Sequence, residues 1–374
     1  MKVLRPRKSL SLILIGFLLL GIVSACKQAP SKKQTAKRKK EPKKEETQKK
    51  EEAKKGIVFP PTLNNLSFPT DLAFAPDGTL YFTEKGGALK VVKVGKLLPD
   101  LLLTIKVPRI FGYNEAGLLG IALSPNFSND HLIYLYHTYA KDGGLVNRVI
   151  RINAERPENE PKVILDNILG GRVHDAGKIQ FSPDGHLFIA TGDAGQGGLA
   201  QRKDSLNGKV LRVNQDGTVA AHNPFPNSAI FSLGHRNIFG MTFDDQGRLY
   251  VTENGPEEKD EVNRIERGKN YGWPEVLGFS EDSRFIDPLI VYEEVNAPTG
   301  IIFYEGDLLP KLKRRLVFGD YLNGNLHLLS LEDGRATDKV VYDLDQGINA
   351  LTASSDGAIY AATRTKIIRI DNLP

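Results

Sequence analysis

One histidine and one aspartate stand where a general base and its orienting partner would be needed. His174 lies in the polar, glycine-rich segment Gly171-Arg-Val-His-Asp-Ala-Gly-Lys178, just before a short apolar stretch typical of a strand. Asp193, in Thr191-Gly-Asp193, ends the next expected strand. If the two strands form a hairpin, the Asp193 carboxylate returns close to His174 and fixes its tautomer, as in a general base. A histidine with a purely structural role in a turn is the alternative.

A second polar segment offers hard oxygen ligands. Glu253, Asp260 and Glu261 lie around Gly255 and Pro256, whose backbone carbonyls add neutral oxygen donors. Carboxylate and carbonyl oxygens are the ligands that calcium prefers. The segment therefore predicts a calcium site, and a solvated acidic loop is the alternative.

Other common chemistries lack their residues. The seven histidines are not spaced as zinc ligands, and no His-Glu-x-x-His motif occurs. The single cysteine, Cys26, lies near the N-terminus, and no serine or cysteine nucleophile motif follows it. Neither zinc chemistry nor covalent catalysis by a serine or cysteine is indicated.

The polar segments lie between copies of one repeat, which must position them. Each copy is a short apolar strand, a turn of the Pro-Asp-Gly type and a second strand rich in aromatic and β-branched residues, which is a hairpin pattern. The copies are residues 72–84, 121–136, 179–191, 241–253, a degenerate 301–320, and 351–363. Further strands are expected at 89–94, 149–153, 210–214 and 366–370.

A period of about 50–60 residues with several strands in each repeat is typical of a β-propeller. We therefore expect an all-β fold, a six-bladed β-propeller of four-stranded blades, over residues 56–374; a β-sandwich is the alternative. The first strand of each blade should line the central channel. The loops that lead into these strands should form the ligand-binding face.

The first 55 residues predict a targeting signal followed by a tether. Four positive charges precede the apolar run Leu10–Val23, and Val23-Ser-Ala-Cys26 is similar to the lipobox of bacterial lipoproteins. We expect a signal peptide at 1–25, then lipidated Cys26 and a disordered Lys/Glu-rich tether over 26–55. The protein would be extracytoplasmic and lipid-anchored to a bacterial cell membrane. An ordinary secretory signal with a chance cysteine is the alternative.

The charge distribution argues against nucleic acid as a partner. Residues 1–55 carry +12 of the formal net charge, which is +5 for the whole chain, so the body carries −7. A mildly acidic body behind a basic tail does not have the basic face of a DNA-binding domain.

The ordered set of polar motifs resembles one enzyme family. The motifs are His174-x-x-Gly-Lys178 before a Phe-Ser-Pro-Asp-Gly strand, Thr-Gly-Asp193, Gly-His-Arg-Asn237, Glu-x-Gly-Pro256 with Asp260-Glu261, and Gly-Lys-Asn-Tyr-Gly-Trp-Pro274. Over roughly residues 60–372 they resemble the soluble aldose or glucose dehydrogenase family, also called glucose/sorbosone dehydrogenases. The resemblance implies a six-bladed propeller with pyrroloquinoline quinone (PQQ) and calcium. Such an enzyme oxidises an aldose at its anomeric carbon to the lactone and passes the electrons to an external acceptor.

The resemblance also implies roles for single residues. His174 would be the general base that takes the proton from the anomeric hydroxyl while hydride goes to the quinone, and Asp193 would orient it. Glu115, at a place where the family often has Gln, would lie near the cofactor. Arg236 and Asn237 would contact PQQ.

The resemblance places the metal in the second polar segment. The carbonyls of Gly255 and Pro256 would hold the calcium that polarises the quinone, a Lewis-acid role. The Glu253 carboxylate lies beside them and is the further candidate ligand.

The chain departs from the family pattern at several cations. The family commonly presents a Lys and an Arg-x-Arg where this chain has roughly Leu322 and Gly347-Ile-Asn349. Because PQQ has three carboxylates, we expect loose binding that depends on calcium. Lys178, Arg172 and Arg202 lie in segments that could reach the same face. The alternatives are a non-catalytic propeller that binds a sugar or a protein, and a calcium-dependent lactone hydrolase.

Overall fold

The computed structural model describes residues 62–374, apart from 94–95, 99–101, 111–113 and 333. The expected signal peptide, lipidated Cys26 and tether at 26–55 lie outside the described residues. Within the described residues, no helix combines the length and the apolar character that crossing a membrane requires.

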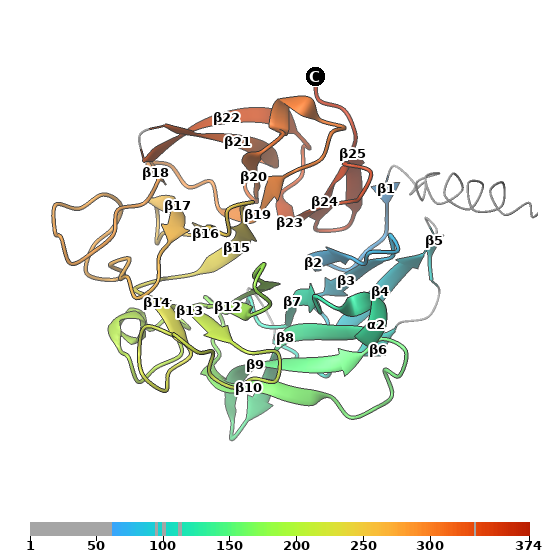
Figure 1. Ribbon diagram of the computed structural model, residues 1–374, viewed down its shortest axis with the longest axis horizontal. Helices are drawn as coiled ribbons and strands as arrows, with labels where there is room; N and C mark the ends of the chain where they lie inside the picture. The colour runs from blue at the N-terminus through green and yellow to red at the C-terminus, as the bar shows by residue number, and fades with distance from the viewer. Residues whose placement is uncertain (1–61, 94–95, 99–101, 111–113, 333) are drawn as a thin grey trace, which may run out of the picture. The chain divides into compact units, whose positions relative to one another are not determined.

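The described chain folds into six antiparallel sheets arranged around one axis, which confirms the expected six-bladed β-propeller (Figure 1). Blade 1 contains β2 (Pro69–Phe74), β3 (Leu80–Glu84) and β4 (Ala88–Lys93) with the short β5 (Lys96–Leu97) and β6 (Leu103–Thr104). Blade 2 contains β7 (Leu118–Leu123), β8 (Leu132–Lys141), β9 (Gly144–Asn153) and β10 (Lys162–Leu169). Blade 3 contains β11 (Ala176–Phe181), β12 (Leu187–Thr191), β13 (Lys209–Val213) and β14 (Ile230–Leu233).

Blade 4 contains β15 (Ile238–Phe243), β16 (Leu249–Glu253), β17 (Asp260–Ile265) and β18 (Ile290–Tyr292). Blade 5 contains β19 (Pro298–Tyr304), β20 (Arg315–Asp320), β21 (Asn325–Glu332) and β22 (Arg335–Asp343). Blade 6 contains β23 (Ile348–Ala353), β24 (Ile359–Thr363), β25 (Ile367–Ile370) and β1 (Thr62–Leu63). The helical segments are α2 (Phe127–Asp130) and the 3₁₀ turns Gly197–Gln201 and Pro310–Leu312.

The second strand of a blade is buried on both faces because neighbouring blades cover it on either side. All residues of β12, β16 and β24 are buried. This explains why their sequences are apolar rather than alternating, apart from the polar residues Thr191, Thr252, Glu253 and Thr363 at their ends. Six separate apolar clusters form the core, and each lies between two adjacent blades. The core is therefore a ring of interfaces.

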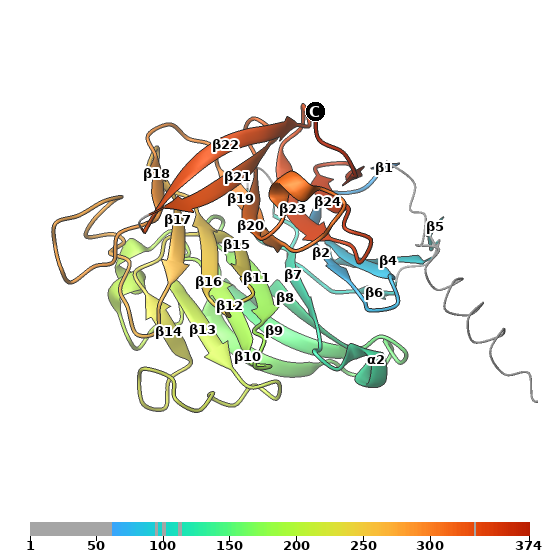
Figure 2. The ribbon, with the colours of Figure 1, turned by 45° about the horizontal axis from the view of Figure 1, so that its top comes forward.

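The ring closes through the beginning of the described chain. β1 pairs with β25, with Thr62 opposite Ile368, so blade 6 takes its outermost strand from the other end (Figure 1). The first strands β2, β7, β11, β15, β19 and β23 contact one another in a circle around the axis (Figure 2). The expectation that first strands surround the channel is confirmed.

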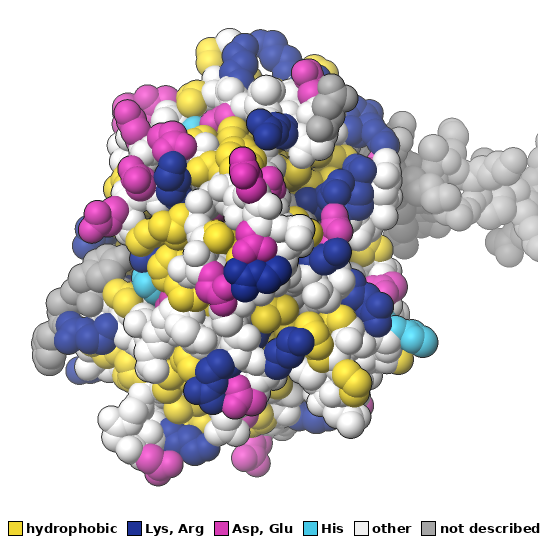
Figure 3. All heavy atoms as spheres, turned by 90° about the vertical axis from the view of Figure 1, so that its left-hand side faces the viewer, with side chains coloured by type: hydrophobic (Ala, Val, Ile, Leu, Met, Phe, Trp, Pro, Cys, Tyr) yellow, Lys and Arg dark blue, Asp and Glu magenta, His cyan; other side chains and the backbone are white. Residues whose placement is uncertain are grey.

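The outer rim over blades 4 and 5 has a mixed surface. On this face acidic and basic side chains are interspersed, and the apolar side chains are divided into several patches (Figure 3). A field of one sign, which nucleic-acid binding requires, is not seen on this face.

Blade 5 holds a buried histidine between two carboxylates. His327 Nε2 lies 2.9 Å from Asp320 Oδ2 and its Nδ1 lies 2.7 Å from Asp338 Oδ2. The Tyr292 hydroxyl donates to the same Asp338 oxygen across the blade interface, and the Phe318 ring stacks on the imidazole. Burial lowers the pKa of His327, but the hydrogen bonds to the two carboxylates outweigh burial and raise this pKa to about 9.

We predict that this histidine makes stability fall with rising pH. Its folded-state pKa is raised, so its contribution of about 3 kcal/mol is complete below pH 6.5 and is lost as the pH rises to about 9. The difference in unfolding free energy between wild type and His327→Gln, from urea titrations at several pH values, should shrink over this window. The exposed His222→Gln is the control. A difference independent of pH would contradict the prediction.

Candidate active site

A cavity of about 550 Å³ lies where the inner strands begin, at one mouth of the channel. Every blade contributes to its wall, for example through Thr70, Glu115, His174, Arg236, Thr299 and Asn349. This convergence matches the expected ligand-binding face of a propeller.

The structure brings His174 and Asp193 together in this wall. His174 precedes β11 and Asp193 follows β12, and the hairpin between these strands sets His174 Nδ1 2.6 Å from Asp193 Oδ1. Asp193 is 1 % exposed, and it also accepts from Gly195 N at 2.7 Å and from Trp273 Nε1 at 2.8 Å. Because Nδ1 is held by the carboxylate, Nε2 is the nitrogen left to exchange a proton.

The backbone around this pair is tight. His174 has φ of 58°, in the left-handed region that residues with a Cβ rarely adopt. At Gly192 a Cβ would lie 1.9 Å from the His174 carbonyl oxygen. Only glycine at position 192 therefore allows the two strand ends to approach closely enough for the pair to form.

Glu115 and Asn237 form a second connected group in the wall. Glu115 Oε2 accepts from Asn237 Nδ2 at 3.0 Å and from Asp175 N at 3.2 Å. Asn237 Oδ1 accepts from Ala176 N at 3.1 Å. Segments leading into three inner strands are thus joined by side chains directly at the cavity.

Asp175, next to His174, is a buried acid that does not line the cavity and to which the sequence analysis gave no role. Its Oδ1 accepts from Asn147 Nδ2 at 2.7 Å and from Gly171 N at 2.9 Å. Its Oδ2 is buried and has no partner among the described residues. Burial raises the pKa of Asp175 to about 6, which leaves it mostly ionised at neutral pH.

Arg236 and Trp273 connect the His174–Asp193 pair to the next blade. The Arg236 guanidinium lies 5.4 Å from the centre of the Trp273 ring and donates to the Asn254 carbonyl oxygen at 2.9 Å. Burial lowers the pKa of Arg236. Trp273 holds Asp193 through its indole N–H, so one tryptophan supports both residues.

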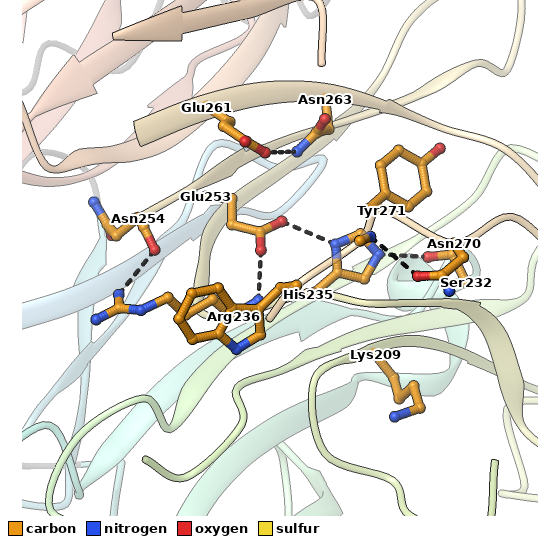
Figure 4. Close-up of polar contacts among 12 residues, drawn as sticks. Lys209, Ser232, His235, Arg236, Glu253, Asn254, Glu261, Asn263, Asn270 and Tyr271 are labelled. Atoms are coloured by element: carbon orange, nitrogen blue, oxygen red, sulfur yellow. Dashed lines mark hydrogen bonds and ion pairs between the residues drawn. The ribbon is translucent and has the colours of Figure 1, made fainter. Parts of the chain in front are cut away.

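Glu253 takes a place different from the expected one. It does not line the cavity; its carboxylate is 5 % exposed as part of a buried chain behind the wall (Figure 4). His235 Nδ1 lies 2.9 Å from Glu253 Oε2, His235 Nε2 lies 2.8 Å from Ser232 Oγ, and Arg236 N donates to Oε1. Both Glu253 oxygens are occupied by protein donors, so Glu253 supports the Arg236 backbone and is not free to bind a metal.

The expected cluster of three carboxylates does not form. In the part of the chain that the structure describes, no three acidic, histidine or cysteine side chains converge on a metal position. Glu261 is half-buried and accepts from Gly278 N and Asn263 Nδ2. Desolvation and the neighbouring Glu253 raise its pKa to about 8. The sequence misled because residues 260–265 form strand β17 rather than a loop.

The backbone carbonyls of Gly255 and Pro256 are the remaining oxygen donors of this segment. Both residues line the cavity. Asp260 holds the turn because its Oδ1 accepts from Gly255 N and its Oδ2 from Asn296 N, each at 2.8 Å. Within the described residues neither carbonyl oxygen accepts a hydrogen bond.

The cations of the cavity differ from those expected. Lys178 lines it and pairs with Asp71. Arg202 instead pairs with Asp204 at the surface, and Arg172 is not part of the lining. Two further cations line the cavity that the sequence analysis did not identify, Lys85 and Arg364. Each directly follows the second strand of its blade, which was the available signal.

Fold and site together define a six-bladed propeller with a hydrogen-bonded His–Asp pair in the wall of a central cavity that four cations line. The family model described as glucose/sorbosone dehydrogenase matches residues 66–369. The chain therefore belongs to the glucose/sorbosone dehydrogenase family and is an oxidoreductase.

Relatives and solved structures agree with this family. The aldose sugar dehydrogenase YliI of Escherichia coli is 28% identical over 339 residues, 80% of this chain and 88% of that protein. The PQQ-bound aldose sugar dehydrogenase of Streptomyces coelicolor is 30% identical, with a TM-score of 0.72 over 83% of this chain and 99% of that one. A solved structure described as an oxidoreductase (glucose dehydrogenase) from Thermus thermophilus is 31% identical, with a TM-score of 0.74 over 82% and 97%.

We predict that Glu253 is essential for stability. Glu253→Ala would leave the buried His235 Nδ1 and Arg236 N–H without an acceptor, at about 1–3 kcal/mol for each. Urea unfolding should show this loss, whereas Glu258→Ala, an exposed position in the same loop, should change little. Equal stability of the two variants would contradict the supporting role.

Proposed function

We propose that the protein oxidises an aldose at the anomeric carbon to the lactone with PQQ and calcium, and passes the electrons to an external acceptor. The observation that carries the proposal is the His174–Asp193 pair, 2.6 Å apart, in the wall of the central cavity. Family membership and the PQQ-bound structure that it resembles support the cofactor.

The cavity residues fit an anionic, oxygen-rich cofactor. Arg236 Nε and Asn254 Nδ2 are buried donors without a partner among the described residues, and both side chains line the cavity. A buried donor without a partner is costly, so a bound acceptor would satisfy both. Arg236 and Asn237 would hold PQQ, and Glu115 would lie beside it.

The residues of the chain would handle the proton. Bound PQQ would supply the acceptor for the hydrogen of C1 and its electron pair. His174 Nε2 would take the proton of the anomeric hydroxyl, so that C1–O1 becomes the lactone carbonyl. Asp193 would keep the proton on Nδ1 beforehand and stabilise the imidazolium afterwards.

The Gly255 and Pro256 carbonyls would hold calcium. Two carbonyl oxygens are hard ligands of the kind calcium takes, and the Asp260 side chain fixes their turn. They are neutral and few, so further ligands would have to come from the bound cofactor or from water. The metal and the cofactor should therefore bind together.

Adding PQQ and calcium and then sugars tests this function directly. We expect a PQQ absorption band on the protein and reduction of an artificial dye when glucose is added, both weakened by a chelator. Cofactor binding without dye reduction by any of a panel of aldoses, or no cofactor binding, would favour the non-catalytic sugar- or protein-binding propeller. Lactone hydrolysis with calcium alone would favour the hydrolase.

Substitution of His174 tests the base. His174→Gln should lower kcat by about 10²–10⁴-fold because general-base catalysis contributes that much, while PQQ binding and the unfolding curve stay unchanged. Asp193→Asn should give a smaller loss through a disturbed tautomer. Full activity in His174→Gln would contradict the assignment.

We also propose that the protein is a lipoprotein held outside the cytoplasm. The support is the sequence Val23-Ser-Ala-Cys26 after a charged and apolar leader. Cys26→Ser should yield a chain that carries no lipid and leaves the membrane fraction. If this variant still partitions into detergent, the apolar run itself is the anchor.

A further inference from the structure

Of the four described cations that line the central cavity, three have no acidic partner. Lys178 pairs with Asp71. Among the residues that the structure describes, no carboxylate oxygen lies within ion-pair distance, 4.0 Å, of Lys85, Arg236 or Arg364. Glu115 and Asp260 also line the cavity but form no ion pair with these three cations. Three cations without a direct ion-pair partner in one cavity favour an anionic ligand there.

Lys85 shows this most clearly. Its ammonium donates to the Asn114 carbonyl oxygen and lies 5.2 Å from the centre of the Phe68 ring. A carbonyl and a ring face do not neutralise the charge. Burial lowers the pKa of Lys85, and the nearby Arg364 adds to this, while Glu115 and Asp175 act in the opposite direction from farther than ion-pair distance.

Lys85 and Arg364 also border a second hollow. A groove of about 760 Å³ adjoins the cavity at the junction of blades 1 and 6 and shares Phe68, Lys85, Asn114 and Arg364 with it. Arg109 adds a third cation, and none of the described residues that line the groove is acidic. The groove therefore extends the positive side of the cavity outward.

We propose that Lys85 and Arg364 form an anion-binding subsite that takes a carboxylate of the molecule bound in the central cavity. Blade 1 faces blade 4 across the ring, so this subsite lies opposite Arg236. The two sides would together bind an acidic molecule through its two ends. The inference rests on the proposed function for its occupants, which are PQQ or an aldose with an acidic group such as glucuronate.

Calorimetric titration of the calcium-loaded full chain tests the subsite. Lys85→Met and Arg364→Gln each remove one charge, and each should weaken binding of the anionic ligand by about 10- to 100-fold. Lys85→Arg should restore most of the affinity. Arg202→Gln, which removes a surface cation paired with Asp204, is the matched control and should bind as wild type does. Arg364 is exposed, so its variant keeps the test valid if Lys85→Met fails to fold.

Two ligands separate the two sources of the carboxylate. Weaker binding of PQQ in the variants assigns the subsite to the cofactor. Unchanged PQQ binding with weaker glucuronate binding, at unchanged KM for glucose, assigns it to an acidic substrate. Unchanged affinity for both ligands would overturn the subsite and leave the proposed function standing. A wild type that binds glucuronate through these residues but not PQQ would refute the proposed cofactor and keep the subsite.

Discussion

Closure of the ring is the constraint on which the rest of this structure depends. Each apolar cluster lies between two blades, so no blade can bury its second strand without both neighbours. The pairing of β1 with β25 supplies the last strand from the far end of the described chain. Only when the circle is complete do the six first strands meet and bring segments distant in sequence, such as those of Glu115 and Asn237, into one wall.

At the channel mouth, buried polar side chains satisfy the backbone hydrogen-bonding groups that strand pairing satisfies elsewhere. The loops at the channel mouth, before the inner strands and between β16 and β17, have backbone N–H groups without strand partners, and carboxylates accept from them. Glu253 serves Arg236 N, Asp260 serves Gly255 N, and Glu115 serves Asp175 N. Because unsatisfied buried donors are costly, these carboxylates fix the conformation of the loops. The side chains of the loops that face the cavity are therefore held in defined positions.

The fold could be predicted because the repeats encode it locally. The Pro-Asp-Gly turns need glycine in the left-handed region, as at Gly185 with φ of 84°, and the second strands are apolar on both faces. The outer strands could not be predicted in the same way. β14 and β18 have only 4 and 3 residues, which is too few for a pattern of alternating side chains to be recognised.

The parts of the site that lie within one hairpin could be predicted from the sequence. The parts whose position depends on contacts between blades or strands elsewhere could not. His174 and Asp193 end two strands of one hairpin, so their meeting follows from the repeat. Glu253 looked like a metal ligand because it stands beside Asp260 and Glu261, yet its side chain turns to His235 across the blade. Lys85 and Arg364 each follow the second strand of a blade, but that they share one cavity could not be predicted, since it depends on blade 1 meeting blade 6.

The central claim is that hydride leaves C1 of an aldose in this cavity while His174 takes the proton. The most direct measurement follows reduction of the bound cofactor in a single turnover, with glucose and with glucose carrying deuterium at C1. The account predicts slower reduction with the deuterated sugar, by a primary isotope effect. Equal rates from the two sugars when the chemical step limits reduction, or no reduction at all, would contradict it.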